Sequence, residues 1–269
     1  MSALRLAIAG AGGRMGRALL EAGCAEAGTT IGAALDIAES AHVGRDAGEL
    51  ATGATGVKVG SDIAAAVAAS DVLIDFTRPA GTLAHLAACR AAKKAIVIGT
   101  TGFEASQVEA IREAAREIPV VFAPNFAIGM LVTFRLVEMA ARALGPEYDV
   151  DVFEAHHKLK VDAPSGTALK LGEVAAKARG TTLAKDGVFA RHGAIGERKA
   201  GTIGFSVVRG GDIVGDHTVY FAGTGERIEI THRSSSRATY AQGAIRAAKW
   251  LSGRAPGLYD MDDVLGLRG

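Results

Sequence analysis

Short apolar runs alternate with helical stretches along the first half of the chain. Runs with the length and composition of buried strands lie at residues 4–9, 30–35, 71–76, 95–98 and 119–122. Between them, Ala-rich segments with helical spacing lie at about 17–27, just after Asp62, at 79–93 and at 104–117. The loop of 37–60 holds one weak strand near 57–59. Strands that alternate with helices predict a doubly wound parallel sheet of the Rossmann type, with right-handed crossovers.

The pattern changes in the second half. The expected elements are a helix at 129–144, a strand at 149–153, a helix from about 165, strands at 202–209, 217–221 and 227–232, and a final helix at 237–250 capped by 234–236. Gly210-Gly211-Asp212 and Gly223-Thr224-Gly225 predict hairpins between the three strands. The polar span 180–200 fits a loop or an edge hairpin. These elements predict a second, α+β domain with a mostly antiparallel open sheet.

Composition narrows the class of protein. A length of 269 residues favours two domains, and 49% hydrophobic residues with a net charge of +1 are typical of a soluble globular protein. This balance predicts no nucleic-acid partner, and the broken apolar runs predict no membrane span. The chain enters a strand almost at once, without the pattern of a signal peptide. Cys24 and Cys89 lie in helical patterns, where we expect buried thiols, no metal site and no redox pair, as in a cytoplasmic protein.

A glycine-rich turn follows the first strand. It comprises Gly10, Ala11, Gly12, Gly13, Arg14, Met15 and Gly16. Glycines at a strand–helix junction let backbone amides approach a pyrophosphate, which then lies at the helix N-terminus. The next strand ends in Asp36, 36 − 16 = 20 residues after the last glycine, where an acid meets the adenosine ribose. Together these features predict a dinucleotide site, although the glycines alone also suit a tight turn and Asp36 alone a plain strand end.

Polar or small turns follow the other strands of the predicted sheet. They are Thr77-Arg78, Gly99-Thr100-Thr101 and Ala123-Pro124-Asn125-Phe126. Each could be a simple turn, but the carboxyl ends of parallel strands share one edge, which is where ligands bind in open α/β sheets. With the glycine turn, they predict a cradle for a nicotinamide cofactor.

Most of the candidate catalytic and substrate-binding residues lie between the strand near 150 and the helix from 165. This stretch contains two adjacent histidines, two lysines and the segment Asp162-Ala-Pro-Ser-Gly-Thr. A histidine is a suitable proton donor near neutral pH, and a fixed lysine charge stabilises an anionic transition state. Ser165, Gly166 and Thr167 open the helix and present N–H groups and a hydroxyl to a carboxylate. A solvated basic loop is the plainer interpretation.

Several of these segments together carry a family resemblance. They are Gly10-Ala-Gly-Gly-Arg-Met-Gly16, Asp75-Phe-Thr-Arg-Pro79, Ile98-Gly-Thr-Thr-Gly102, Glu154-Ala-His-His157, Lys160-Val-Asp-Ala-Pro-Ser-Gly-Thr-Ala168 and Gly201-Thr-Ile-Gly-Phe205. The chain resembles the 4-hydroxy-tetrahydrodipicolinate reductases, formerly called dihydrodipicolinate reductases, nearly from end to end. That resemblance implies NADH- or NADPH-dependent reduction of a cyclic dicarboxylate imine in lysine and diaminopimelate synthesis, by a cytoplasmic homotetramer. Because one face of an open sheet can pair with copies of itself, we expect the tetramer to assemble through the second-domain sheet.

The resemblance also implies roles for particular residues. His156 is then the proton donor and Lys160 its catalytic partner, while His157, Gly166 and Thr167 hold the substrate carboxylates. The expected cofactor residues are those of the turns, from Gly10 to Met15, Asp36, Arg78, Gly99 to Thr101, and Ala123 to Phe126. The last helix returns to the first domain, so the expected boundaries are 1–127 with 236–269 for the cofactor, and 128–235 for substrate binding and assembly.

Two questions stay open at this level. Some family members carry Arg after the ribose acid, where it pairs the NADP 2′-phosphate; here the residue is Ile37, so we expect both cofactors to work, with NADH at least as good. Glu154 and Asp162 either orient the basic residues or only cap the local structure.

Five further residues are expected to have no catalytic role. Trp250 is expected to be a core residue, and the others are expected to be surface or strand-end residues: Arg191, His192, His217 and His232. The alternatives are another two-domain NAD(P)-dependent reductase and a non-catalytic NAD(P) sensor.

Overall fold

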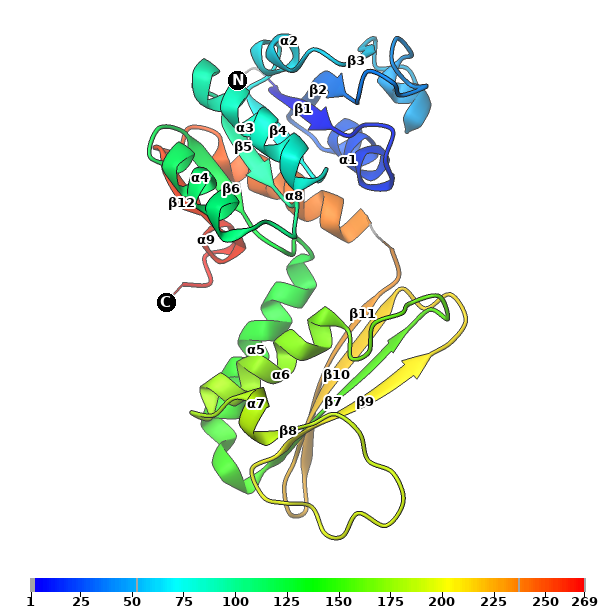
Figure 1. Ribbon diagram of the computed structural model, residues 1–269, viewed down its shortest axis with the longest axis vertical. Helices are drawn as coiled ribbons and strands as arrows, with labels where there is room; N and C mark the ends of the chain where they lie inside the picture. The colour runs from blue at the N-terminus through cyan, green and yellow to red at the C-terminus, as the bar shows by residue number, and fades with distance from the viewer. Residues whose placement is uncertain (1–2, 52, 237, 269) are drawn as a thin grey trace. The chain divides into compact units, whose positions relative to one another are not determined.

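The computed structural model describes residues 3–51, 53–236 and 238–268. The chain forms two compact units, the first from Met1–Ile128 with Arg237–Gly269 and the second from Gly129–Ser236. Figure 1 shows the elements of both units. No helix among the described residues has the length and apolar character that crossing a membrane requires.

The first unit is built on a seven-stranded sheet in the order β12-β6-β5-β4-β1-β2-β3. All of its strand pairs are parallel. The strands are β1 (Leu4–Ala9), β2 (Thr29–Leu35), β3 (Val59–Gly60), β4 (Val72–Asp75), β5 (Ala95–Ile98), β6 (Pro119–Phe122) and β12 (Gly257–Tyr259). The order reverses between β1 and β4, which is the place where doubly wound sheets bind ligands. The predicted Rossmann-type fold is confirmed.

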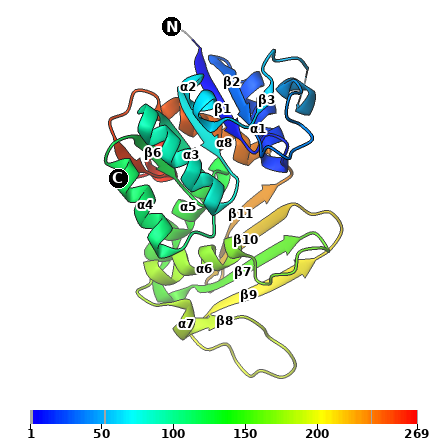
Figure 2. The same ribbon diagram turned by 45° about the horizontal axis from the view of Figure 1, so that its top comes forward.

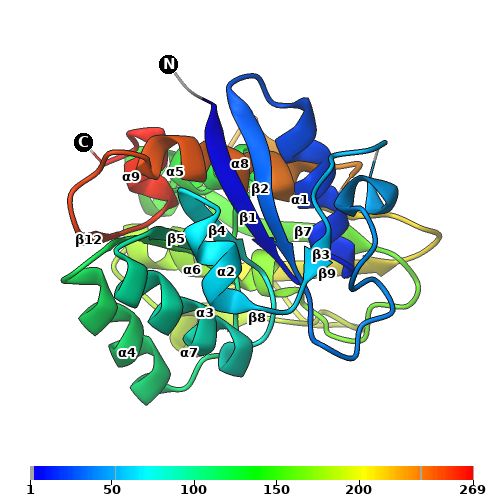
Figure 3. The same ribbon diagram turned by 90° about the horizontal axis from the view of Figure 1, so that it is seen from above.

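Helices cover both faces of this sheet, as the view from above in Figure 3 shows. They are α1 (Arg14–Ala25), η1 (Ala47–Leu50), α2 (Ile63–Ala68), α3 (Pro79–Ala92), α4 (Ala105–Ala115), α8 (Ala238–Leu251) and α9 (Met261–Leu265). Helix α2 begins just after Asp62 as predicted, and Asp62 caps it, since its side chain accepts the Ala65 N–H. Because both faces are covered, β4 and β5 are buried along their whole length, which explains their continuous apolar runs.

The last long helix packs closely in the first unit. A β-carbon added to Gly243 of α8 would lie 1.8 Å from the Phe126 carbonyl oxygen. Helix α8 also contacts α1 and strands β4, β5 and β6. The predicted start of this helix at Arg237 lies outside the described residues. Trp250, expected in the core, is half-buried, with Tyr259 edge-on to its ring and the Arg254 guanidinium 4.1 Å from the ring centroid.

The second unit is a five-stranded mixed sheet in the order β11-β10-β7-β9-β8. Its elements are α5 (Ile128–Leu144), η2 (Gly145–Glu147), β7 (Asp149–His156), α6 (Gly166–Ala178), α7 (Leu183–Asp186), β8 (Gly187–Val188), β9 (Ile203–Arg209), β10 (Gly215–Ala222) and β11 (Arg227–Ser234). Strand β10 pairs antiparallel with β7 and β11, whereas β9 pairs parallel with β7 and β8. Figure 2 shows α6 lying over this sheet, where it contacts β7 and β9.

Three local predictions need correction. The hairpin predicted at Gly210-Gly211 is wrong, because β7 lies between β9 and β10; the second hairpin, between β10 and β11, is confirmed. Cys24 is exposed and not buried, whereas Cys89 is buried. The weak strand near 57–59 is displaced to Val59–Gly60, where it pairs with β2.

Candidate active site

The glycine turn after β1 has a separate steric reason for each of three glycines. Gly10 has a φ of +67°, in the left-handed region that favours glycine. A β-carbon on Gly16 would lie 2.0 Å from the Gly10 carbonyl oxygen, and one on Gly12 would lie 2.6 Å from Asp36 Oδ2. Gly13 caps α1 without a side-chain hydrogen bond, so the first N–H groups of α1 have no side-chain cap. This turn fits a pyrophosphate.

Asp36 is held beside that turn. Its Oδ2 accepts hydrogen bonds from the Gly12 N–H and the Ser40 hydroxyl, both at 3.0 Å. Its Oδ1 accepts the N–H of Ile37, whose side chain is 68% exposed. The carboxylate therefore lies where the adenosine ribose of a dinucleotide would need an acceptor. The unit thus contains the backbone and carboxylate groups that a nicotinamide dinucleotide requires.

A buried polar network joins the turns after β4 and β5. Asp75 is fully buried and accepts hydrogen bonds from the N–H and hydroxyl of Thr77 at 2.7 Å, and from the Thr100 hydroxyl at 3.3 Å. His85 Nδ1 lies 2.7 Å from its other oxygen. Burial alone would raise the pKa of Asp75, but the hydrogen bonds from His85 and Thr77 outweigh it and lower that pKa. The network fixes Thr100, a predicted cofactor residue.

Phe76 connects the turn after β5 with the turn after β6. A β-carbon on Gly99 would lie 2.1 Å from the Phe76 ring, and Phe76 meets the buried Phe126 edge-on with centroids 5.1 Å apart. Asn125 Oδ1 accepts the Ala127 N–H and shapes that turn. The structure therefore brings together the predicted residues of three turns.

The burial of the remaining predicted cofactor residues varies: Ala11 and Ala123 are buried, Met15 is half-buried, and Arg14, Arg78, Thr101 and Pro124 are exposed.

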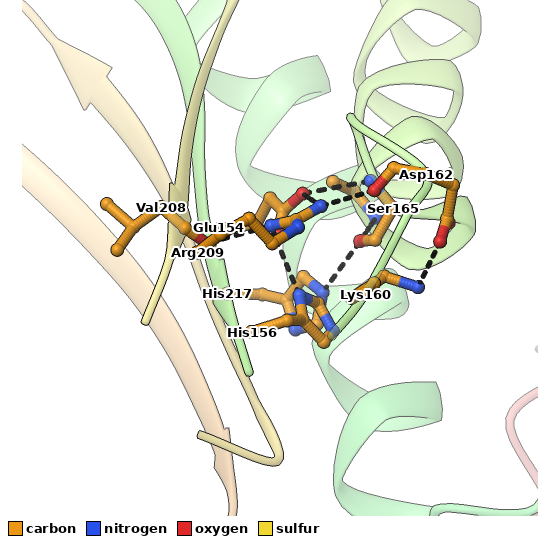
Figure 4. A network of polar contacts seen from close by, with 9 residues as sticks. Glu154, His156, Lys160, Asp162, Ser165, Val208, Arg209 and His217 are labelled. Atoms are coloured by element: carbon orange, nitrogen blue, oxygen red, sulfur yellow. Dashed lines mark hydrogen bonds and ion pairs between the residues drawn. The ribbon is translucent and has the colours of Figure 1, made fainter. Parts of the chain in front are cut away.

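In the second unit, strand register brings four polar residues to one place. Glu154 and His156 are two residues apart on β7, so they share a face. Across the ladders, His217 of β10 lies opposite Glu154, and Arg209 of β9 lies opposite His156. Figure 4 shows these side chains beside the start of α6. Sequence reasoning missed the two partners, because their position depends on which strands flank β7.

Glu154 is the centre of this group. It is fully buried, and its Oε2 lies 2.6 Å from His156 Nδ1. The Arg209 guanidinium donates to both carboxylate oxygens at 2.8 Å, and the Ser165 N–H donates to Oε1 at 2.9 Å. Burial opposes the charged form, but the hydrogen bonds from Arg209, His156 and Ser165 keep the pKa of Glu154 below its usual range.

The start of α6 adjoins the group. Ser165 caps the helix as predicted, because its Oγ accepts the Ala168 N–H. The same Oγ lies 3.2 Å from Nε2 of His217. A β-carbon added to Gly166 would meet no atom within 4 Å, so space is open at the first helical residue. The end of α6 therefore has accessible N–H groups of the kind that bind carboxylates.

Lys160 and His157 lie in the loop that joins β7 to α6. Lys160 Nζ lies 2.8 Å from Asp162 Oδ1, and this contact lowers the pKa of Asp162. Lys160 is 22% exposed at its side chain, whereas Leu159 and Val161 beside it project into solvent. Within the described chain, Nδ1 of the half-buried His157 has no hydrogen-bond partner. The predicted basic residues therefore remain within one loop, next to the start of α6.

His217 differs most from its prediction. It is 4% exposed and meets the His156 ring edge-on, with centroids 5.1 Å apart. Burial, and after it the positive charge of His156, lowers the pKa of His217 to about 4. The expectation of a surface or strand-end residue is therefore wrong for His217. Arg191, in the loop after β8, donates a hydrogen bond to Asp151 Oδ1 at 2.6 Å, which anchors that loop to β7.

Comparison with known proteins matches both units to one family. Residues 4–126 match the family model described as dihydrodipicolinate reductase, N-terminus, and residues 129–265 match the corresponding C-terminus model. The chain is 60% identical to the 4-hydroxy-tetrahydrodipicolinate reductase of Aromatoleum aromaticum, over 100% of this chain and 97% of that protein. It is 58% identical to the enzyme of that name from Laribacter hongkongensis, over 100% of both chains.

A solved structure shares the fold. The dipicolinate-bound dihydrodipicolinate reductase from Paenisporosarcina superimposes with a TM-score of 0.78 at 24% identity, over 96% of this chain and 97% of that one. At this identity the likeness supports the fold.

Proposed function

Because this chain belongs to the dihydrodipicolinate reductase family, we propose that it reduces 4-hydroxy-tetrahydrodipicolinate to tetrahydrodipicolinate with loss of water. It is an NAD(P)H-dependent oxidoreductase of lysine and diaminopimelate biosynthesis. The observation that carries the proposal is the buried Glu154–His156 pair next to the start of α6. An acid and a carboxylate-binding helix end are what a dicarboxylate imine requires.

His156 is the proton donor in this proposal. An ionised carboxylate can only accept a hydrogen bond, so Nδ1 of His156 carries the hydrogen that faces Glu154. The proton for the substrate therefore leaves from Nε2. A β-carbon on Gly215 would lie 3.1 Å from that atom, so glycine at this position keeps the space beside it clear. Lys160 contributes a positive charge, which stabilises the negative charge that develops on the substrate.

The substrate carboxylates bind at the start of α6. Gly166 and Thr167 present backbone N–H groups there, Thr167 adds a hydroxyl, and Ser165 holds the helix end through its cap. His157, with Nδ1 unpartnered within the described chain, provides a further donor from the loop. These roles require no metal ion.

The first unit binds the cofactor through the glycine turn, Asp36 and the turns after β4, β5 and β6. The bound dinucleotide supplies the hydride. Ile37 offers no charge for a 2′-phosphate, so both NADH and NADPH are used, with NADH at least as effective.

Steady-state kinetics on the parent and on His156→Gln, each with NADH and with NADPH, test the proposal. We expect kcat of the variant to fall by about 100-fold or more, as for loss of a general acid, while NADH binding measured by fluorescence stays the same. An unchanged kcat would exclude His156 as the proton donor. Absence of turnover in the parent would leave a dinucleotide sensor, and a large NADPH advantage would refute the cofactor assignment.

The remaining assignments concern the units and their assembly. The first unit is the cofactor-binding domain, and the second binds substrate and mediates assembly into a cytoplasmic homotetramer. The face of the second-unit sheet opposite Glu154 and His156 supports this, because it carries Val208, which is 41% exposed, and Tyr220. Such a face can pair with a copy of itself.

A further inference from the structure

Glu154 faces the proton donor and also forms an ion pair with Arg209, a residue to which nothing above assigns a function. We propose that this pair positions the proton donor and ties it to the substrate-binding end of α6, an inference that rests on the proposed function. Glu154 keeps the hydrogen of His156 on Nδ1 before and after proton transfer. Arg209 keeps Glu154 ionised throughout. Neither touches the reacting atoms, so both are positioning residues.

The hydrogen-bond inventory of Glu154 supports the first part. Its two oxygens accept from His156, from both terminal nitrogens of Arg209 and from the Ser165 N–H. A protonated carboxyl would have to turn a hydrogen toward one of these donors, so the site favours the ionised form. In the neutral imidazole, one nitrogen carries the hydrogen and the other does not. With Nδ1–H fixed by Glu154, Nε2 of His156 is the nitrogen that gains and loses the proton.

Arg209 has its own part in each turnover. When Nε2 of His156 gives its proton to the substrate, the positive charge of the imidazolium disappears. A buried carboxylate without a counter-charge would then tend to take up a proton. The Arg209 guanidinium remains charged at any pH of interest and donates to both oxygens, so the carboxylate stays ionised while His156 changes its charge.

The same pair also holds the end of the active-site loop that adjoins α6. Arg209 Nη2 donates to the Asp162 carbonyl oxygen at 2.5 Å, and Glu154 accepts the N–H of Ser165. At the other end, the Gly210 N–H donates to the His156 carbonyl oxygen at 2.9 Å. Residues 157–164, which include Lys160, therefore lie between anchors on β7, β9 and α6. Loss of the pair would loosen the proton donor and the carboxylate site together.

Two substitutions test the pair on the full-length protein. Glu154→Gln keeps the shape and removes the charge; Arg209→Lys keeps the charge and removes the two-point contact. Asp71→Asn is the matched control, because Asp71 forms a similar two-point pair with Arg5 in the first unit. The readouts are kcat and KM from about pH 5.5 to 9, the melting temperature and NADH binding.

We expect Glu154→Gln to lower kcat by about 100-fold, at the lower end of what general acid catalysis contributes, because the proton donor loses the group that orients it. On the alkaline side of the pH profile, we expect this variant to lose activity at a lower pH than the parent, because the negative charge that favours the protonated imidazole is gone. Arg209→Lys should retain part of kcat with a raised KM for the substrate. NADH binding should be the same in all variants, and Asp71→Asn should keep the parental pH profile.

A parental kcat and alkaline limb in Glu154→Gln would overturn the inference, provided that His156→Gln is inactive. Should Glu154→Gln fail to fold, Arg209→Lys decides: a parental kcat and KM in that variant would refute the proposed role of the pair. If His156→Gln itself retains full turnover, the proposed function of His156 fails instead. The two failures are therefore distinguishable.

Discussion

Residue-scale chemistry is clearest at His217, where burial decides the charge state. Its pKa of about 4 lies below the usual 6.5, so it is neutral at pH 7. The unfolded chain takes up a proton on this residue as the pH falls through about 6.5, but the folded chain does so only near pH 4. Protons therefore favour the unfolded state between these values, and stability decreases as the pH falls.

A shift of this size corresponds to about 3 kcal/mol in the free energy of unfolding, lost between pH 6.5 and 4. We expect His217→Gln to lack this component. Urea unfolding of parent and variant at several pH values measures it. If the difference between the two curves is independent of pH, His217 does not titrate as the structure indicates.

The same residue shows where prediction from sequence stops. His156, Lys160 and Ser165 to Thr167 were predicted as one site because they lie within one short stretch of chain. Arg209 is 55 residues from Glu154, and His217 is 52 residues from Ser165. Their positions follow from strand register, which no local pattern near 209 or 217 determines. The buried Asp75 network was missed for a related reason, since its partners come from the turns after β4 and β5 and from α3.

At the scale of elements, the glycine pair after β9 is instructive. Gly210-Gly211 is a strong local signal for a hairpin, and the second signal, near Gly225, did correspond to one. After β9, however, β7 occupies the adjacent place in the sheet, so the same residues form a wider connection around its end. The parallel strands of the first unit were more predictable, because each carries its own apolar run and its own crossover helix.

Helix α8 provides a test at this scale. Gly243 lets the helix approach the Phe126 carbonyl oxygen, and an added methyl group would have to lie 1.8 Å from it. We expect Gly243→Ala to cost about 1–3 kcal/mol, as for overpacked cores, despite the better helix propensity of alanine. Thermal or urea unfolding measures the change. Gln242→Ala, at an exposed neighbouring position, is the control and should be nearly neutral.

At the scale of the whole molecule, the sequence predicted the fold class and the alternation of elements, and the structure confirms both. The mixed character of the second sheet was less accessible. Its β7–β9 pair is parallel and joins strands that are separated by α6, α7 and a long loop. Antiparallel pairing was the natural expectation for strands with short connections, and it holds for β10 and β11.

Assembly is also a property of the whole molecule. Sedimentation analysis should give the mass of a tetramer, four times 27.5 kDa. Val208→Lys places a charge on the sheet face that we assign to assembly, and should shift the protein to smaller species. The mass of the parent chain as a monomer would contradict the assignment. Persistence of the tetramer in Val208→Lys would place the contact on another surface.

The order of segments in the first unit has a consequence for protein synthesis. When the ribosome has released residues up to 128, helix α8 and strand β12 of this unit have not yet been made. The second unit is a continuous piece of chain, from 129 to 236, and domains generally fold as units as they emerge. We therefore expect the unit that begins second on the ribosome to be the first that is finished.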